Sequence, residues 1–393
     1  MAGILEGIRV LDFGRYIAGP FCCGLLADLG AEVIRIERPG GAEDRFIMPV
    51  TDSGEGSLYF HSNRGKKSLT LENTTPEGRE VVRRLIAGSD VVVANLSPGG
   101  LKYFGLDYEG VRAIREDIIL TTVNAFGPSG PLADAVGFDG VGQAVSGAVY
   151  LTGEPGHPHR SATAYVDFST ALSCAYGTLA AIVQRMRTGR GMHVRASLVG
   201  TALNVMAPIL MEHAGGRNPR VPTGNRAQIA GPSDIFRAAD GWFIMQVQGP
   251  KMYRRWCELV GRPELFDDPR YADDALRGRN GAALSAVMQA WAQTRTRDEC
   301  LAALEAASLA ASPVLSPDEV LSGTLSLTDT FTRSAPYPGT EGIMQFAPPV
   351  SFSDEAAQRM GPPPALGEHS REVLTSYGFS EAEIADLSAR GII

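Results

Sequence analysis

Residues 8–37 read IRVLDFGRYIAGPFCCGLLADLGAEVIRIE, and this stretch decides the fold. Ile8–Phe13 is rich in β-branched and large apolar residues and ends at a glycine, which predicts a strand. Pro20–Leu29 is apolar and helical in pattern, and Ala31–Glu37 returns to a strand pattern. A strand, a helix and a second strand within about thirty residues are typical of a parallel crossover unit.

The same alternation recurs further along the chain. We expect helices at Gly78–Ala87 and Tyr108–Arg115, each followed by a strand, at Asp90–Asn95 and Ile118–Asn124. Alternating strands and helices indicate an α/β fold with a doubly wound parallel sheet.

The pattern of predicted elements changes in the later part of the chain. Ser169–Arg187 predicts a long apolar helix and His193–Val199 another strand. From the basic, turn-rich segment at 217–226 we expect a second, smaller α/β domain covering residues 221–325, with a hairpin that turns at Asp240-Gly241. Residues 1–220 then form the first part of a large domain.

Composition narrows the function. The chain has 44 acidic and 36 basic residues, and it therefore lacks the basic excess of a typical nucleic-acid-binding protein. Its five cysteines are odd in number and include no C-x-x-C pair, which argues against a disulfide framework or a zinc site. We see no secretory signal and no membrane span, and we expect a cytoplasmic protein without a membrane or nucleic-acid partner.

Several enzyme classes lack their motifs here. The glycines at 137–147 do not form G-x-G-x-x-G, and the chain has no phosphate-loop motif and no G-x-S-x-G. His157 and His159 form an H-x-H pair, but no nearby residues complete a ligand set. We therefore expect no metal site, and the α/β pattern does not indicate a dehydrogenase or a nucleoside triphosphatase.

The ends of the predicted strands are the place to look for a site, because ligands of open parallel sheets bind beyond the carboxyl ends of the strands. Four segments follow the four strands. They are 14–16, 37–38, 95–97 and 125–127. Arg38 in this set could bind a phosphate or could be a surface arginine, and the nearby Arg64, Lys66 and Lys67 could anchor a phosphorylated cofactor or form a solvated charged run.

Asp167 lies in AYVDFSTAL, where the chain enters the long apolar helix. One interpretation is a helix N-cap, because aspartate is favoured there. The other is a nucleophile: the helix N-terminus stabilises the anion, so we expect a pKa at or below about 3.9 and a carboxylate able to attack an activated carbonyl.

Seven segments of the chain, taken in order, resemble the family III CoA-transferases (the CaiB/BaiF family), which include formyl-CoA transferase and carnitine CoA-transferase. The most specific are GIRVLDF with AGPFCCGLLADLGAEVIRIERPGG in 7–41, NRGKKSLTL at 63–71 and LGEH at 366–369. The others are 91–109, 188–198, 224–226 and 264–280. The resemblance implies that residues 326–393 return to the large domain, and that two chains form an interlocked homodimer.

The resemblance also implies an activity: CoA moves from an acyl-CoA to a free carboxylic acid through an aspartyl anhydride and an aspartyl-CoA thioester, with CoA as a cosubstrate and no tightly bound cofactor. Asp167 falls on the family's nucleophile. The positions that match the family's CoA contacts are Ile17, Ala18, Arg38, Leu71, Glu72, Asn73, Thr74, Asn95, Leu96, Ser97, Tyr103, Val136, Gly137, Phe138 and Asp139.

Positions at which this sequence differs from other family members limit the range of expected substrates and reactions. Ile17 stands where formyl-CoA transferase has glutamine, Tyr103 stands at a commonly basic position, and Phe138 stands where the racemase branch has histidine. Arg15, Arg45 and Arg226 could hold a second carboxylate, which points to small acids that include a dicarboxylate. The alternatives are a 2-methylacyl-CoA racemase or epimerase and a non-catalytic acyl-CoA-binding protein.

Overall fold

A computed structural model describes residues 3–216, 219–323, 331–333, 337, 339–340, 344–354, 358 and 360–393. The chain divides into two compact units. The first comprises Met1–Ser146, Ala162–Val205 and Asp329–Ile393, and the second comprises Gly147–Ser161 and Met206–Thr328.

These units differ from the predicted domains at 147–161 and 206–220, which the prediction placed in the large domain. The helix α9 (Leu198–Ala214) runs from the first unit into the second, so no change in composition marks the border there. The backbone N–H of Gly224 donates to the carbonyl of Gly153 over 3.1 Å, which ties the 147–161 segment to the second unit.

A six-stranded parallel sheet organises the first unit, in the order β3-β2-β1-β4-β5-β6. This confirms the predicted α/β fold. The strand order reverses between β1 and β4, where an open parallel sheet offers a crevice for a ligand. The strands are β1 (Arg9–Asp12), β2 (Glu32–Glu37), β3 (Lys67–Thr70), β4 (Val91–Ala94), β5 (Ile119–Asn124) and β6 (His193–Ser197).

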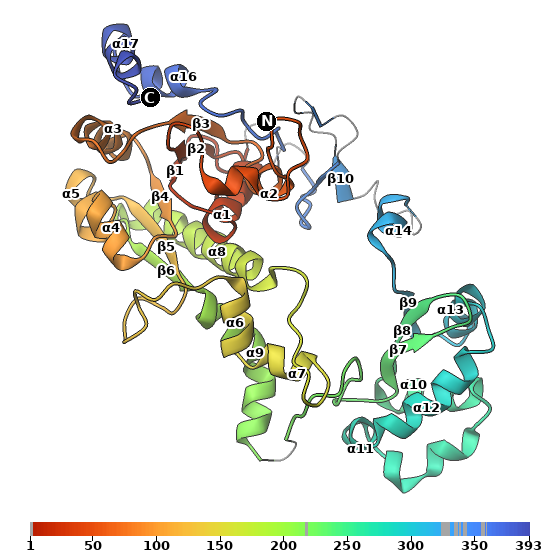
Figure 1. Ribbon diagram of the computed structural model, residues 1–393. Helices are drawn as coiled ribbons and strands as arrows, with labels where there is room; N and C mark the ends of the chain where they lie inside the picture. Colours follow the sequence, from red (N-terminus) through yellow and green to blue (C-terminus); the bar gives the residue numbers. More distant parts are fainter. Residues whose placement is uncertain are drawn as a thin grey trace. The chain divides into compact units, whose positions relative to one another are not determined.

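Helices cover both faces of this sheet, because successive strand residues point to opposite sides. Val10 of β1 belongs to the core under α1 (Ala18–Asp28) and α8 (Tyr165–Thr188), whereas its neighbour Leu11 belongs to the core on the other face. α8 packs against α1, β5 and β6 (Figure 1). The other core is closed by α3 (Pro76–Ala87), α5 (Tyr108–Ile114), α16 (Ser370–Ser376) and α17 (Glu381–Ala389).

α8 has 24 residues, and its most apolar 18-residue window has a mean hydropathy of 1.4, so by length and composition it could span a membrane. Half of its most apolar window is buried inside the protein. This buried half supplies Val166, Cys174 and Ile182 to the core shared with α1.

Both chain ends contribute to the first unit. The C-terminal segment pairs with β3: Gly367 N–H donates to the Ser68 hydroxyl over 2.9 Å, and His369 N–H donates to the Ser68 carbonyl over 3.0 Å. This confirms the large domain built from both ends of the chain. Its shorter elements are α2 (Ser57–Ser62), α4 (Pro98–Phe104), α6 (Asp139–Val145), β10 (Thr332–Arg333), β11 (Gln345–Phe346) and the 3-10 turn η1 (Glu43–Phe46).

The second unit is a smaller α/β body built on an antiparallel sheet in the order β7-β8-β9. β7 (Ser233–Arg237) and β8 (Trp242–Gln246) confirm the predicted hairpin, and β9 (Ala310–Pro313) pairs with β8. Its helices are α7 (Ala148–Thr152), α10 (Gly249–Leu259), α11 (Asp274–Arg279), α12 (Gly281–Ala292), α13 (Arg297–Ala306) and α14 (Pro317–Leu321), with 3-10 turns η2 (Pro263–Asp267) and η3 (Pro269–Tyr271).

Candidate active site

A cavity of about 300 Å³ lies where the sheet order reverses, beyond the carboxyl ends of β1, β4 and β5. It brings together many of the predicted site residues, as the strand-end argument requires. Those residues are Ile17, Ala18, Asn95, Leu96, Ser97, Val136, Gly137, Phe138 and Asp167. The predicted strand-end segments 14–16 and 125–127 also supply Arg15, Tyr16 and Ala125 to its lining. The prediction missed six further lining residues, which are Val123, Asn124, Ala133, Asp134, Ala135 and Leu198.

Asp167 lies in the first turn of α8, but it is not the N-cap. Ala164 occupies that position and has no side chain able to cap. The N-cap interpretation of Asp167 was therefore wrong. The helix starts four residues earlier than predicted, which moves Asp167 inside the first turn and leaves its carboxyl at the cavity wall.

The cap comes from a different helix. Asp139, at the start of α6, is buried, and its Oδ1 accepts the backbone N–H groups of Val166 over 2.7 Å and of Asp167 over 3.2 Å. Gln143 donates to the other carboxylate oxygen. Asp139 was predicted as a CoA contact, but its carboxylate is engaged with α8 and does not line the cavity.

Burial raises the pKa of the Asp167 carboxyl to about 7, and the nearby charge of Asp139 acts in the same direction. The prediction of a pKa at or below about 3.9 was therefore wrong. It counted the helix N-terminus, which favours the anion, and omitted the loss of water and the second acid. A carboxyl with this pKa is more basic than an ordinary aspartate and is about half ionised at neutral pH.

The loop after β1 is held rigidly. Asp12 Oδ1 accepts Gly14 N–H over 2.8 Å, and the buried Arg35 donates to the Gly14 carbonyl. The amide of Asn95, after β4, accepts Arg15 N–H and donates to the Arg15 carbonyl, each over 2.6 Å. Side chains from β1, from β2 and from the residue after β4 therefore fix the backbone of this loop at the cavity.

Tyr16 follows in the left-handed conformation, with φ +60°. Such a conformation is costly for a tyrosine and persists only where its surroundings enforce it. Its ring meets the ring of Phe138 edge to face, with centroids 5.5 Å apart. The two aromatic rings line the cavity that contains Asp167. Phe138 has no group that could donate or accept a proton.

A narrow crevice of about 30 Å³ adjoins this region and shares Arg15 and Leu96 with the larger cavity. Three further predicted residues, Arg38, Leu71 and Asn73, line it. The Arg38 guanidinium is about half exposed and lies 2.9 Å from Glu43.

The remaining predicted contacts lie outside both cavities. Glu72 accepts both the backbone N–H and the hydroxyl of Thr74. Tyr103 is exposed and packs edge to face on Phe104, with Arg79 over its ring. None of these three residues lines the cavity of Asp167 or the adjoining crevice.

The basic residues of NRGKKS are structural, and neither predicted role fits them. Arg64 is buried and paired with Asp28. Lys66 is buried, and its Nζ donates to Asp12, to Asn63 and to the Pro20 carbonyl. Lys67 lies 2.7 Å from both Glu32 and Glu372. Because the first two cations are buried and all three are paired, this segment is neither a solvated run nor a free anchor for a cofactor.

The predicted spare arginines also differ in their surroundings. Arg45 is buried, pairs with Glu37 over 2.6 Å and donates to the Tyr59 hydroxyl over 2.7 Å. Arg226 belongs to the second unit and donates to the Gly278 carbonyl. Of the three, Arg15 alone lines the cavity with Asp167.

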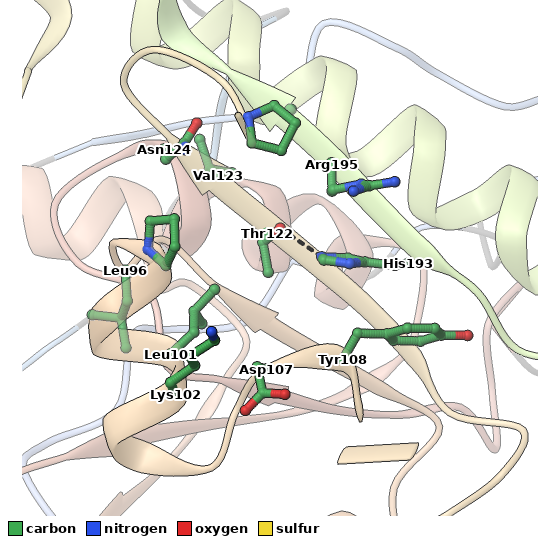
Figure 2. Close-up of a pocket in the computed structure, with 13 residues that line it drawn as sticks. Leu96, Leu101, Lys102, Asp107, Tyr108, Thr122, Val123, Asn124, His193 and Arg195 are labelled. Carbon is green, nitrogen blue, oxygen red and sulfur yellow. Dashed lines mark hydrogen bonds between the residues drawn. The ribbon is translucent and has the colours of Figure 1, made fainter. Parts of the chain in front are cut away.

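A side cavity of about 160 Å³ lies over the β5 and β6 strands and lacks Asp167 (Figure 2). Thr122 Oγ1 and His193 Nε2 are 2.8 Å apart, and the imidazole stacks on Tyr108. Burial and the nearby Arg195 lower the pKa of His193 to about 4, so this histidine is neutral at pH 7. Within the described residues, no three His, Cys, Asp or Glu side chains gather as a metal site, and His157 and His159 lie on an exposed loop.

The model of one protein family, CoA-transferase family III, matches residues 5–370. The chain belongs to this family. It is 32% identical over 400 residues to the succinyl-CoA–D-citramalate CoA-transferase of Chloroflexus aurantiacus, covering 99% of this chain and 98% of the relative. The succinate–glutarate CoA-transferase of Agrobacterium fabrum is 32% identical over 378 residues and covers 94% of each chain.

Solved structures agree with this assignment. The crystal structure of a CaiB/BaiF family protein from Brucella suis superposes with a TM-score of 0.83 at 32% identity, covering 96% of this chain and all of that one. The predicted family, the α/β fold and the CoA-transferase class of enzyme are thereby confirmed. As a CoA-transferase, the protein uses a CoA thioester as its cosubstrate, with a carboxylic acid as the partner in exchange.

Proposed function

We propose that this CoA-transferase exchanges CoA between small dicarboxylic acids through covalent intermediates on Asp167. The observation that carries the proposal is the position of this carboxyl. It lines a cavity bounded by the loops after β1, β4 and β5, with a pKa raised to about 7 by burial and by Asp139.

The chemistry follows from a carboxylate facing a thioester. The Asp167 carboxylate attacks the acyl carbon of the donor, the C–S bond breaks, and CoA leaves as the thiolate beside an acyl–aspartyl anhydride. The thiolate then attacks the aspartyl carbonyl, which forms aspartyl-CoA and releases the donor acid as its carboxylate. The acceptor carboxylate repeats these two steps in reverse, so the new acyl-CoA leaves and Asp167 is regenerated.

The environment of Asp167 suits both the formation of the covalent intermediates and their transfer to the acceptor acid. Its raised pKa makes the ionised form a stronger nucleophile than an exposed aspartate. The rigid loop around Gly14 and Asn95 keeps one wall of the cavity in place between steps, which favours exchange without loss of the intermediate to water.

Two observations support the dicarboxylate class. The names of the two relatives describe them as acting on succinate, glutarate and D-citramalate, and all three are small dicarboxylates. In this chain the aromatic pair Tyr16 and Phe138 narrows the cavity, which favours short acyl chains. Phe138, without a proton-transferring group, also disfavours the racemase alternative.

The test is capture of the intermediate. The protein is incubated with succinyl-CoA without an acceptor, digested, and read by peptide mass spectrometry. We expect a CoA adduct on the peptide that contains Asp167, no adduct for Asp167→Asn, and loss of its transfer activity. Asp134→Asn is the matched control, because Asp134 is a second carboxylate that lines the cavity. It should keep the adduct on Asp167.

A matrix of acyl-CoA donors against free acids, read as the thioesters formed, defines the substrate class. We expect succinate and glutarate to be accepted well above acetate and butyrate. An adduct on Asp134, or a folded Asp167→Asn variant with near wild-type turnover, would overturn the assignment of Asp167.

A further inference from the structure

Arg15 combines a fixed backbone with an unengaged side chain. The side-chain amide of Asn95 forms hydrogen bonds with both the backbone N–H and the backbone carbonyl of Arg15, as described above. Its guanidinium, in contrast, forms no hydrogen bond or ion pair with any described residue, and its Nη1 is buried without a partner. A buried cationic donor without a partner is costly in a native structure, and it calls for an acceptor that the folded chain does not supply.

The acids near Arg15 are already engaged by other arginines. Asp44 pairs with Arg35 over 2.8 Å, and Glu37 pairs with Arg45 over 2.6 Å. Glu43 pairs with Arg38 over 2.9 Å. Arg15 is therefore the surplus positive charge of this cluster. Burial and the neighbouring Arg35 lower its pKa from the usual value, but an arginine remains protonated at neutral pH.

Its position between the cavities indicates the ligand. Arg15 lines the cavity of Asp167 and also the crevice lined by Arg38, Leu71 and Asn73. A CoA thioester whose acyl carbon lies at Asp167 must extend its phosphorylated end away from that carboxyl. The crevice offers two guanidinium groups, and a guanidinium matches the geometry of a phosphate with paired N–H donors.

We propose that Arg15 binds a phosphate group of the CoA thioester, together with Arg38, at the junction of the two cavities. This deepens the proposed function and rests on it, because it takes CoA as the ligand of this site. The phosphate group that Arg15 binds is either the diphosphate or the 3′-phosphate of CoA. Analogues of CoA that lack the 3′-phosphate, or that lack both groups, distinguish these two possibilities.

The experiment measures binding by titration calorimetry, which needs no turnover. Arg15→Gln and Arg15→Lys are compared with wild type for CoA, 3′-dephospho-CoA and pantetheine. The matched control is Arg83→Gln, an exposed arginine on α3 paired with Glu80. Circular dichroism checks that each variant is folded, and Arg15→Lys retains a charge if the neutral variant does not fold.

We expect Arg15→Gln to weaken CoA binding by about 10- to 150-fold, the effect of losing a charge-assisted hydrogen bond. Arg15→Lys should recover part of this loss, and Arg83→Gln should match wild type. Equal loss with 3′-dephospho-CoA assigns the diphosphate, and no loss with that ligand assigns the 3′-phosphate. Pantetheine, which lacks both, should bind all variants alike.

Two results would overturn the proposal. One is CoA binding by folded Arg15→Gln within about twofold of wild type. The other is unchanged CoA binding together with a raised KM for succinate and not for acetate, which would assign Arg15 to the distal carboxylate of the acid. Wild type that binds CoA without transferring it would overturn the proposed function alone, because the binding comparison still holds.

Discussion

Asp139 Oδ1 accepts the backbone N–H of Asp167 over 3.2 Å, so two acids share the N-terminus of α8. One is buried and caps the helix, and the other faces the cavity. The helix N-terminus favours negative charge, but two carboxylates at one site oppose each other's ionisation. With burial as the larger cause, the outcome is a pKa of about 7 for Asp167.

The rate should therefore depend on pH through Asp167. Only its ionised form attacks the thioester, so kcat/KM for the acyl-CoA should fall below pH 7, by about tenfold per pH unit at low pH. Initial rates at limiting acyl-CoA between pH 5 and 9, with buffer ionic strength held constant, measure this limb. A flat profile between pH 5 and 8 would contradict the raised pKa.

Asp139→Asn separates the charge of Asp139 from its capping role. The amide oxygen can still accept from the first turn of α8, but the negative charge is gone, so the pKa of Asp167 should fall. We expect the acid limb of the rate profile to move to lower pH. Asp139→Ala removes the cap as well and should cost about 0.5–2 kcal/mol in the free energy of unfolding. A limb that stays in place in Asp139→Asn would show that the charge has no effect.

Asp167→Asn should change stability in a pH-dependent way. The folded pKa of Asp167, about 7, lies above its ordinary 3.8. In the native state Asp167 therefore stays protonated up to a higher pH than in the unfolded chain. As pH rises from about 4 to about 7, Asp167 increasingly destabilises the native state relative to the unfolded state. Asparagine removes this effect.

The variant should exceed wild type in stability by about 1 kcal/mol near pH 4.5 and by up to about 4 kcal/mol at pH 8, the equivalent of roughly three pH units. Urea unfolding at the two pH values, at one fixed protein concentration, provides the measurement. Asp134→Asn serves as the comparison, since Asp134 is the other acid of the cavity. A variant that is less stable than wild type at pH 8 would contradict the sign of the effect.

Local pattern was enough to predict most of the sheet. Runs such as VVVA in β4 and ILTTVN in β5 carry their own strand propensity, and each falls within a residue or two of the predicted strand. β3 was missed because KSLT begins with a lysine and reads as part of a charged segment. It is a strand because it pairs in parallel with β2. Glu32 and Glu372 neutralise Lys67, and Gly367 N–H bonds to Ser68 at its other edge.

The candidate site was predicted in position but not in chemistry. The strand-end rule gave the loops at 14–16 and 95–97, since parallel strands place their carboxyl ends at one edge. The state of Asp167 depends on Asp139, 28 residues earlier, and on burial by the whole domain. Whether each arginine is free to bind a ligand also depends on residues that are distant in sequence. Arg45, for example, donates to the Pro364 carbonyl, and the residues next to Arg45 in the sequence do not predict this contact.

Arg45→Ala should lower stability and leave acid selectivity unchanged. Arg45 is buried with Glu37 and Tyr59, and removing one partner of a buried ion pair typically costs about 3–5 kcal/mol. We expect a lower urea midpoint and the same ratio of succinate to acetate turnover as wild type. Arg83→Ala, on an exposed face, should change stability by less than about 0.5 kcal/mol. A change in the ratio at unchanged stability would return Arg45 to the substrate site.

The last prediction concerns assembly. Leu172, Tyr176, Val183 and Met186 are exposed, with 46–79% of each side chain accessible. Their spacing of four, seven and three residues places them on one face of α8. A contiguous exposed apolar stripe of this kind marks a contact surface, and the family resemblance implies an interlocked homodimer. We therefore expect a second copy of the chain to cover this face.

Light scattering coupled to size exclusion should give about 84 kDa, twice the 41.8 kDa of the chain, and dilution to nanomolar concentration should not release an active monomer. Tyr176→Glu with Met186→Glu places two charges in the stripe and should reduce the yield of folded dimer. Gln184→Glu, on another side of the same helix, should not, because its side chain lies about 100° away around the axis. A compact, active species of about 42 kDa would show that no second copy covers the stripe, and the homodimer would then have to be abandoned.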